Sequence, residues 1–498
     1  MNDLLDDLFV FEMANNHQGS VEHGLKVIDA AARIARTQKI KAAVKLQFRE
    51  LDSFIHPDFK GRQDVDHIPR FESTRLSKDE FRQLTDAVRS AELISVATPF
   101  DEDSVGTCLD LGIQVIKVAS CSATDWPLLT AIAGARKPVI ASTGGLNILD
   151  IDNLVSFFRK RVPGFALMHC VSLYPTPNDH VALNFMEKMI RRYPYVRVGY
   201  SGHEAPKNTE VVVAAVSKGA RILERHIGVP ADGVTLNKYS VNPAQAEQWV
   251  LAAQRARAIC GDDQNKHVGQ KERDSLLSLQ RGVYARRSLA KGRPIEDGDV
   301  FFAMPCQAGQ LSSGDFGHLR AHFAASRDYA ADEPIRELPK PDPVTNLRGV
   351  LHDAKGQLYE AGIVLGEDNA IEISHHYGIE TFRQTGCIIV NIVNREYCEK
   401  LLIMLPSQSH PLHAHRIKEE TFRLLWGDLE VKLNDNTVHM QPGDKLLIER
   451  GDVHGFSSVG GAIVQEVSTT HVVGDSDYED PRIRELDPMQ RKTILESW

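Results

Sequence analysis

The pattern of apolar and polar positions in the first 265 residues alternates between two kinds of segment. Short, nearly continuous apolar runs are separated by longer stretches of helical spacing, such as 24–37, 78–91 and 208–218. Continuous apolar runs are typical of strands buried on both faces. They lie at 8–14, 42–48, 94–99, 113–118, 138–142, 165–170, 196–200 and 221–226. Eight strand-then-helix units predict a (β/α)8 TIM barrel over residues 1–265, with a doubly wound open sheet as the alternative.

Polar residues stand where each predicted strand ends. The carboxyl ends of barrel strands build the active site. Strand ends also meet solvent, where a lone hydroxyl costs little. The two lysines at strand ends need another explanation, because burying a lysine ammonium group costs several kcal/mol unless an anion pairs with it. We therefore predict a functional pocket from Glu12, Lys45, Gln47, Thr98, Lys117, Ser120, Ser142, His169, Ser172, Ser201, His203, Glu224 and His226.

The residue types indicate the chemistry of this pocket. Lys45 and Lys117, together with the surrounding hydroxyls, suit a small polyanion that carries a phosphate and a carboxylate. A Ser-Thr-Gly-Gly turn at 142–145 precedes a predicted helix, whose backbone N–H groups favour anions. His203 and His226 end adjacent strands, and two imidazoles suit Mn²⁺, Fe²⁺ or Zn²⁺. Two hydrogen-bonded rim histidines are the alternative.

Eight segments in one order resemble the sialic acid synthase family. They are FEMANNHQGS (11–20), VKLQF (44–48), ATPFD (97–101), IKVAS (116–120), ASTG (141–144), MHCVSLYPTP (168–177), GYSGH (199–203) and ILERH (222–226). That family condenses phosphoenolpyruvate (PEP) with an N-acetylhexosamine. The resemblance implies an N-acetylneuraminate synthase-like transferase that forms a 3-deoxy-2-keto sugar acid, a nonulosonate, and releases phosphate.

The same resemblance implies a role for each matching residue. PEP would be held by Lys45, Thr98, Lys117, Ser120, Ser142, Ser172 and Ser201. A divalent ion, Mn²⁺ or similar, would be bound by His203 and His226, with Glu12 near its water. Gln47 and Tyr174 would line the sugar side. The implied catalytic set is Glu12, Lys45, Lys117, His203 and His226.

The chain departs from the family pattern where the sugar is expected. Gly202 stands where an aspartate is usual, and Ser122 stands where a glutamate is usual. Asn237 lies where the family has Asp-His. Replacing a carboxylate by Ser or Asn changes which hydroxyls are recognised. We place Ser122 and Asn237 at the sugar, whose identity stays open, with N-acetylmannosamine as one candidate.

Residues 275–338 predict a small β-rich domain, because apolar residues alternate around a Lys-Gly turn at 291–292. The segment resembles the antifreeze-like (SAF) module that follows the barrel in sialic acid synthases. Arg281 falls at the arginine that, in that family, reaches the barrel of the partner subunit. The resemblance thus implies a sugar contact by Arg281 and a homodimer. A surface arginine clustered with Arg286 and Arg287 is the alternative.

A third region follows a proline-rich stretch at 337–343 that is typical of a linker. Strand-like runs at 387–393, 401–405, 421–426, 429–433, 445–448 and 462–467 predict a small β-barrel or jelly roll. His413 and His415, two apart on a strand, share a face, and Glu420 and His454 complete a set of metal ligands. Two motifs, HxH(x)4E(x)6G over 413–427 and G(x)7G(x)2H over 443–454, resemble those of the cupin family. The resemblance implies a cupin domain over 344–480 with a second divalent metal. A metal-free cupin is the alternative.

Composition narrows the class of protein. The chain of 498 residues is 42% hydrophobic and 25% charged, which is ordinary for globular domains. A net charge of −9 without a basic stripe gives no support for nucleic-acid or anionic-membrane partners. No apolar run approaches the roughly 20 residues that span a bilayer. Seven cysteines without CxxC spacing indicate reduced thiols and a cytoplasmic protein.

By the resemblance to sialic acid synthases, the expected partners are PEP and an aldose. Two alternatives to the synthase remain. One is a metal-dependent sugar isomerase, epimerase or aldolase with its chemistry in the cupin domain. The other is a sugar-binding protein with a decayed barrel, against which the intact Lys45, Lys117, His203 and His226 argue.

Overall fold

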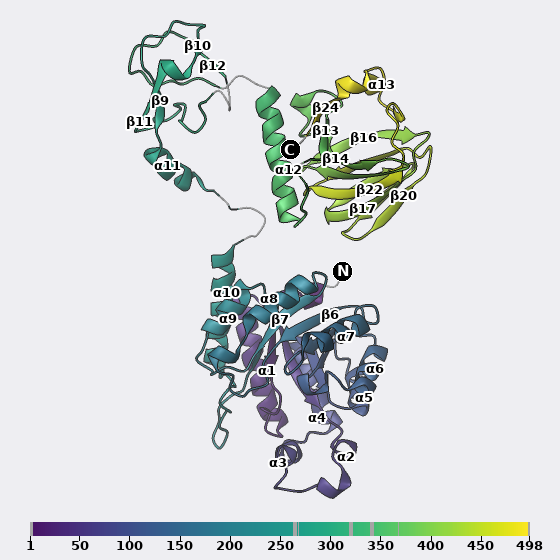
Figure 1. Cartoon of the computed structure of the whole chain (residues 1–498). Helices are drawn as coiled ribbons and strands as arrows, with labels where there is room; N and C mark the ends of the chain where they lie inside the picture. The colour runs from purple at the N-terminus through teal and green to yellow at the C-terminus, as the bar shows by residue number, and fades with distance from the viewer. Residues whose placement is uncertain are drawn as a thin grey trace. The chain divides into compact units, whose positions relative to one another are not determined.

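The computed structural model describes residues 3–261, 266, 268–317, 322–338, 343–366 and 368–496. They fall into two compact units, Met1–His267 and Val268–Trp498. In Figure 1 the first unit, coloured purple to teal, shows strands surrounded by helices. In the described ranges, no helix combines the length and the hydropathy needed to cross a bilayer.

The first unit is a closed barrel of eight parallel strands in sequential order. The strands are β1 (Leu8–Glu12), β2 (Lys41–Phe48), β3 (Ile94–Pro99), β4 (Val115–Val118), β5 (Val139–Ser142), β6 (Phe165–His169), β7 (Arg197–Gly202) and β8 (Ile222–His226). Around them lie α1 (Val21–Gln38), α4 (Lys78–Ser90), α5 (Glu102–Asp110), α6 (Trp126–Gly134), α7 (Ile148–Phe158), α8 (Leu183–Arg192), α9 (Glu210–Ser217) and α10 (Pro243–Cys260). Each predicted run overlaps one strand, so the TIM barrel is confirmed and the open sheet is wrong.

Alternation along the strands separates two apolar layers. Side chains such as Phe9 and Val44 belong to the layer beneath the helices. The intervening residues form a smaller cluster that fills the barrel. On four strands, the residue two positions after an interior apolar residue is ionisable. Val10 is followed by Glu12, Ala43 by Lys45, Val115 by Lys117, and Ile222 by Glu224. The polar groups therefore converge above an apolar plug at the carboxyl ends.

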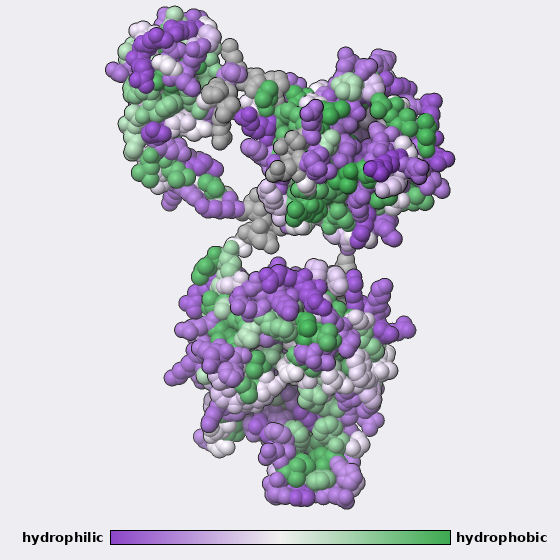
Figure 2. All heavy atoms as spheres, in the orientation of Figure 1, coloured by the Kyte–Doolittle hydropathy of each residue, from purple (hydrophilic) through white to green (hydrophobic). Residues whose placement is uncertain are grey.

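A long connection between β2 and α4, residues 49–76, is here called the tip segment. It contains α2 (Leu51–Phe54), the 3-10 turn η2 (Pro57–Phe59) and α3 (Ile68–Ser73). Figure 1 places α2 and α3 side by side beyond one end of the barrel. Phe54 and Phe59 are about two-fifths exposed, and Figure 2 shows a hydrophobic patch at this tip within a hydrophilic surface.

The second unit begins with α11 (Gln270–Leu279) and four short strands. Antiparallel pairs join β9 (Gly282–Ala285) to β11 (Val300–Ala303) and β10 (Pro294–Ile295) to β12 (Phe323–Ala324). Val283, Leu289 and Ile335 belong to its own small core. The assignment of residues 275–338 to an SAF module stays a prediction.

The rest of this unit is built from two sheets with strand orders β20-β17-β22-β15-β14-β13-β24 and β19-β18-β21-β16-β23. The strands are β13 (Ala370–Ser374), β14 (Cys387–Asn394), β15 (Tyr397–Met404), β16 (Gln408–His415), β17 (Glu420–Gly427), β18 (Leu429–Leu433), β19 (Asn436–Met440), β20 (Lys445–Ile448), β21 (His454–Ser458), β22 (Ala462–Thr469), β23 (Ser476–Tyr478) and β24 (Lys492–Leu495). Side chains from strands of both sheets form one apolar core, which confirms the β-rich domain.

One helix of this region was not predicted. α12 (Pro343–Glu360) contributes Val350, Ala354 and Leu358 to a second apolar cluster with Ile371 and Ile373 of β13. A short α13 (Pro481–Arg484) follows β23. Residues 339–342 of the expected linker lie outside the described residues. α12 begins at Pro343, the last residue of the proline-rich stretch.

Candidate functional site

A cavity of about 650 Å³ opens at the carboxyl ends of the barrel strands. It is lined by most of the residues that the sequence singled out: Glu12, Lys45, Gln47, Thr98, Lys117, Ser120, Ser142, Ser172, Tyr174, Ser201, His203, Glu224 and His226. His169 is instead buried, with its Nε2 2.7 Å from the Val181 carbonyl oxygen. Ser122 and Asn237 do not line the cavity either, and Asn237 accepts hydrogen bonds from its own turn, at Tyr239 and Ser240.

A network of buried charges forms the floor of the cavity. The ammonium group of Lys45 lies 2.5 Å from Glu12 and 2.7 Å from Glu224. Lys117 Nζ lies 3.1 Å from the other oxygen of Glu224, and Ser201 donates to the same carboxylate at 2.9 Å. All four ionisable side chains are at most 5% exposed. The two lysines are thus balanced by two carboxylates of the protein.

This network shifts the pKa of each member. Burial raises the pKa of Glu12, although Lys45 opposes the shift. Burial alone would raise the pKa of Glu224, but Lys117 and Lys45 outweigh it and leave that pKa well below its ordinary value. Burial lowers the pKa of Lys117, whereas the carboxylates raise the pKa of Lys45 above its ordinary value despite its burial. Lys45 is therefore the more firmly protonated of the two lysines.

Hydroxyl and backbone donors surround one side of this floor. Gly144 donates its N–H to Ser120 Oγ at 3.0 Å, and Thr98 Oγ1 is buried without a hydrogen-bond partner. A Cβ on Gly144 would lie 2.4 Å from Ser172 Oγ and 2.8 Å from Ser120 Oγ. The absence of a side chain at Gly144 therefore leaves room for the hydroxyls to gather. Together with the lysines, they form a donor set that suits an anion.

The two histidines of the predicted metal site lie side by side. The ring centroids of His203 and His226 are 5.4 Å apart, and burial lowers the pKa of both, to about 4 for His203. His203 Nδ1 lies 3.1 Å from the Val171 carbonyl oxygen, which leaves Nε2 for another partner. Neutral imidazoles are the form that binds metal. The pair therefore fits a divalent ion that takes its remaining ligands from water or substrate.

Several lining residues were missed by the sequence reasoning. The tip segment contributes Arg49, His67, Arg70 and Phe71, other loops contribute Phe100, Cys121 and Cys170, and Tyr239 comes from the loop after β8. The Tyr239 ring lies 5.0 Å from His226. Glu224 was predicted to line the pocket, but its pairing with both lysines was not predicted. Its inward position, two residues after Ile222, was the available signal.

The predicted ligands of the cupin region come together in the described residues. One ligand atom each from His413, His415, Glu420 and His454 lies within 4.8 Å of the others, and all four residues are buried. His413 Nδ1 and His454 Nδ1 each lie 3.1 Å from a backbone carbonyl oxygen. Such contacts orient the rings and leave each Nε2 available. His454 Nε2 lies 2.8 Å from Glu420 Oε1, so the nitrogen and carboxylate ligand atoms converge on one point, as a metal site requires.

A buried acid–base pair adjoins this cluster and was also missed. Lys418 forms ion pairs with Glu420 and, at 2.9 Å, with Glu466 of β22, while Ser468 donates to Glu466 at 3.0 Å. Both members of the Lys418–Glu466 pair are at most 5% exposed. They line a cavity of about 70 Å³ together with His413 and His415 of the cluster. Glu466 lies on the same face of β22 as the core residues Ala462 and Val464. This spacing of two could have predicted from the sequence that Glu466 points inward.

Arg281 lies in the second unit, where its guanidinium is 5.8 Å from the Phe302 ring. Arg287 instead forms an ion pair with the buried Asp299 at 2.6 Å, and Arg286 donates to the Val300 carbonyl. The three arginines thus have separate surroundings. The contact of Arg281 with a partner barrel stays a prediction.

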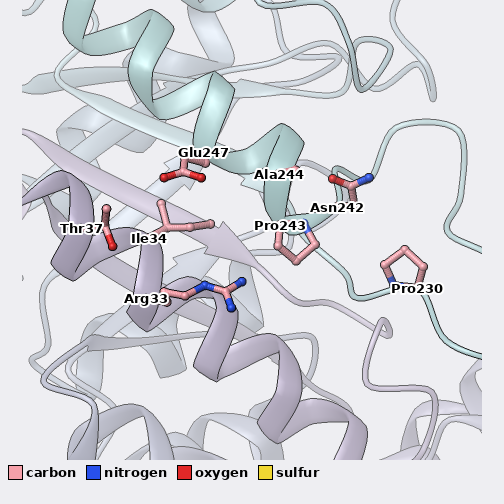
Figure 3. Close-up of a pocket in the computed structure, with 8 residues that line it drawn as sticks. All are labelled: Arg33, Ile34, Thr37, Pro230, Asn242, Pro243, Ala244 and Glu247. Atoms are coloured by element: carbon pink, nitrogen blue, oxygen red, sulfur yellow. The ribbon is translucent and has the colours of Figure 1, made fainter.

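Another hollow of about 490 Å³ lies beside α1 and the start of α10 (Figure 3). Arg33 of α1 and Pro243 of α10 are among the residues around it. Glu247 in this hollow accepts a hydrogen bond from Gln38 at 2.9 Å. It contains none of the predicted catalytic residues. The barrel cavity is therefore the stronger candidate for an active site.

The fold and the site together define a TIM-barrel protein whose cavity at the carboxyl ends of the strands carries a donor set that suits an anion. The NeuB family model matches residues 28–265, and a cupin domain model matches residues 400–468. N-acetylneuraminate-9-phosphate synthase of Drosophila melanogaster is 33% identical over 362 residues, which are 67% of this chain and 95% of that protein. The chain therefore belongs to the NeuB family, which confirms the resemblance, and it carries a cupin domain.

Two further relatives agree with this assignment. N,N'-diacetyllegionaminic acid synthase of Campylobacter jejuni is 24% identical over 340 residues, covering 66% of this chain and 99% of that protein. The crystal structure of a spore coat polysaccharide biosynthesis protein E from Chromobacterium violaceum shares 43% identity at a TM-score of 0.65. That similarity covers 67% of this chain and 99% of the other.

Proposed function

We propose that the barrel condenses PEP with an aldose to give a 3-deoxy-2-keto sugar acid and phosphate. The observation that carries this proposal is the pair of buried lysines, Lys45 and Lys117, in one cavity with a group of hydroxyls and two neutral histidines. Relatives named as synthases of three such acids, N-acetylneuraminate-9-phosphate, diacetyllegionaminic acid and pseudaminic acid, support the reaction class.

In this proposal Lys45 and Lys117 hold the phosphate and carboxylate of PEP, together with Thr98, Ser120, Ser142, Ser172 and Ser201. The methylene carbon of PEP attacks the aldehyde carbon of an open-chain sugar. Water adds to the resulting cationic centre, and phosphate leaves. Glu12, whose pKa is raised by burial, is placed to take a proton from that water.

His203 and His226 are the residues that would hold a divalent ion in the barrel. When bound, such an ion supplies Lewis-acid polarisation of the sugar aldehyde. His203 contributes an imidazole that is fixed by the Val171 carbonyl oxygen and kept neutral by burial. Gln47 and Tyr174 line the same cavity and are proposed to contact the sugar.

The test is phosphate release from PEP by the full-length, Mn²⁺-loaded protein with a panel of aldoses. The panel contains N-acetylmannosamine, 2,4-diacetamido sugars, hexoses, pentoses and their phosphates, and products are weighed by mass spectrometry. Sugar-dependent release that is lost in His203→Ala supports the proposal. Failure to bind PEP, measured by calorimetry, would overturn it.

A second activity is favoured by the Lys418–Glu466 pair beside the cupin cluster. We propose that the cupin domain isomerises or epimerises a sugar, with a metal held by His413, His415, Glu420 and His454. Glu466 would remove the proton from the carbon next to the carbonyl, while Lys418 holds the carboxylate in place. Return of the proton to the former carbonyl carbon, with the hydroxyl proton passing to the former carbonyl oxygen, isomerises the sugar. Protonation of the original carbon on its opposite face epimerises it. Isomerisation of the barrel's acceptor would link the two activities.

This activity can be tested in the full chain without PEP, because the barrel then lacks its donor. Aldoses and ketoses are incubated in D2O, and deuterium incorporation is followed by NMR. Glu466→Gln should abolish incorporation while leaving the metal content unchanged. An unchanged rate in Glu466→Gln, or no incorporation by the wild type across the panel, would refute the second activity.

The resemblance also supports a homodimer in which Arg281 of the SAF module reaches the other barrel. Light scattering would give the molecular mass in solution. In this proposal Arg281→Ala raises the KM for the sugar and leaves PEP binding unchanged. A monomer that is fully active at all protein concentrations would contradict it.

A further inference from the structure

Two arginines at the mouth of the barrel cavity have no carboxylate partner among the described residues. Arg49 and Arg70 both belong to the tip segment and both line the cavity. The other cations of the lining, Lys45 and Lys117, are paired with Glu12 and Glu224. These two glutamates are the only carboxylates of that lining. The lining therefore carries two cationic charges more than it needs for internal balance.

The guanidinium of Arg49 is held in place. Its central carbon lies 3.5 Å from the Phe100 ring centroid and 4.2 Å from that of Phe71. One terminal nitrogen donates to Gln47 Oε1 at 3.1 Å, and Nε is buried without a hydrogen-bond partner. Burial lowers the pKa of Arg49 to about 10, so the group is still a cation at neutral pH. Stacking on aromatic rings leaves the planar edge of a guanidinium free to bind an oxyanion.

The position of Arg49 links it to the acceptor side of the cavity. It contacts Gln47, which is proposed to contact the sugar, and it belongs to the tip segment, whereas the lysines rise from the floor. Arg70 follows on α3 of the same segment and is exposed to solvent. A cation that is held rigidly, with open donors and no protein anion, suits an anionic ligand group.

We infer that the acceptor sugar carries an anionic group, a phosphate ester or a carboxylate, that binds Arg49 and Arg70. This inference rests on the proposed function and specifies its acceptor. PEP is the first anion of the site and matches the lysines, while the charge on the sugar matches the arginines. A neutral aldose would leave both guanidinium groups without a counter-ion.

The experiment separates acceptor binding from catalysis by using reduced sugars that cannot react. The full-length protein is saturated with PEP, and calorimetry measures the binding of N-acetylmannosaminitol, its 6-phosphate, and the corresponding C6 carboxylate. An Arg–oxyanion contact is expected to strengthen binding about 10- to 100-fold. We therefore expect the phosphate or the carboxylate to bind at least about tenfold more tightly than the neutral alditol. Comparing the two anions identifies the source of the charge.

Variants assign the effect to the arginines. Arg49→Gln and Arg70→Gln should each remove most of the preference for the anion and leave the Kd for PEP unchanged. Arg62→Gln is the matched control, because Arg62 lies in the same segment but pairs locally with Asp64 and does not line the cavity.

Equal affinity for neutral and anionic alditols would overturn the inference, and so would absence of binding by all three. A preference for the anion that persists in both arginine variants would do the same. If PEP still binds in these cases, the proposed function stands. Loss of PEP binding in the wild-type protein would instead remove the proposed function itself.

Discussion

Glu224 is the single carboxylate that contacts both buried lysines, so its neutralisation tests the charge network directly. In Glu224→Gln the shape is kept, but Lys45 and Lys117 face each other with only Glu12 as counter-charge. Removing one partner of a buried pair typically costs about 3–5 kcal/mol. Gln can still accept from Ser201, and Lys117, whose pKa burial already lowers, can lose its proton. We therefore expect the lower end, about 3 kcal/mol.

Differential scanning fluorimetry with and without PEP measures this effect. For a domain of this size, about 3 kcal/mol lowers the melting temperature by roughly 6–12 °C. PEP should then raise the melting temperature of Glu224→Gln more than that of the wild type. The reason is that in the wild type PEP competes with Glu224 for the lysines, whereas in the variant it restores the missing negative charge.

Glu204→Gln is the matched control. Glu204 is fully buried and forms an ion pair with the equally buried Arg225, but it does not line the cavity. It should destabilise the barrel to a similar extent without enlarging the effect of PEP. If Glu224→Gln melts within about 2 °C of the wild type, the network contributes little and the reasoning is wrong. If PEP raised the melting temperature equally in Glu224→Gln and Glu204→Gln, PEP would not bind at the two lysines.

Three further outcomes are expected. Gly144→Ala should weaken PEP binding about tenfold with little change in melting temperature, because the added Cβ would displace the hydroxyls of Ser172 and Ser120. Gly134→Ala, whose Cβ meets open space, should change neither the PEP affinity nor the melting temperature. Burial lowers the pKa of His376 to about 3, so below pH 6.5 the unfolded chain binds more protons than the folded chain, and the free energy of unfolding falls as the pH falls. Denaturant titrations at pH 5 should show a loss of about 2 kcal/mol from His376, and His376→Leu should remove this loss. His413→Ala should remove one bound metal per chain in elemental analysis, whereas an unchanged metal content would place the ion elsewhere.

The barrel and its floor could be predicted because both depend on local rules. Strands buried on both faces need continuous apolar runs, and an ionisable residue two positions beyond an interior apolar one must enter the barrel mouth. The same parity placed His413 and His415 on one face. The pairing of Glu224 with two lysines could not be read in this way, because it depends on which of eight strands lie across the barrel from one another.

Other features were missed for different physical reasons. α12 follows a proline-rich stretch, and its apolar positions are few, although Val350, Ala354 and Leu358 recur every four residues. The tip segment has no clear period, so the approach of Arg49 to the cavity depends on its packing against Phe71 and Phe100. Ser122 and Asn237 were placed from motif alignment alone. The described turn uses the Asn237 side chain to accept from two backbone N–H groups.

Three buried lysines of the two candidate sites are paired with carboxylates, whereas Arg49 is not. In the barrel, Lys45 and Lys117 are neutralised by Glu12 and Glu224; in the cupin, Lys418 is neutralised by Glu420 and Glu466. Leaving one of these buried ammonium groups without its carboxylate would cost several kcal/mol. The half-buried guanidinium of Arg49 is nonetheless held between two rings without an anion. Its counter-charge must therefore come from solvent or from a ligand, and its place in the cavity favours the ligand.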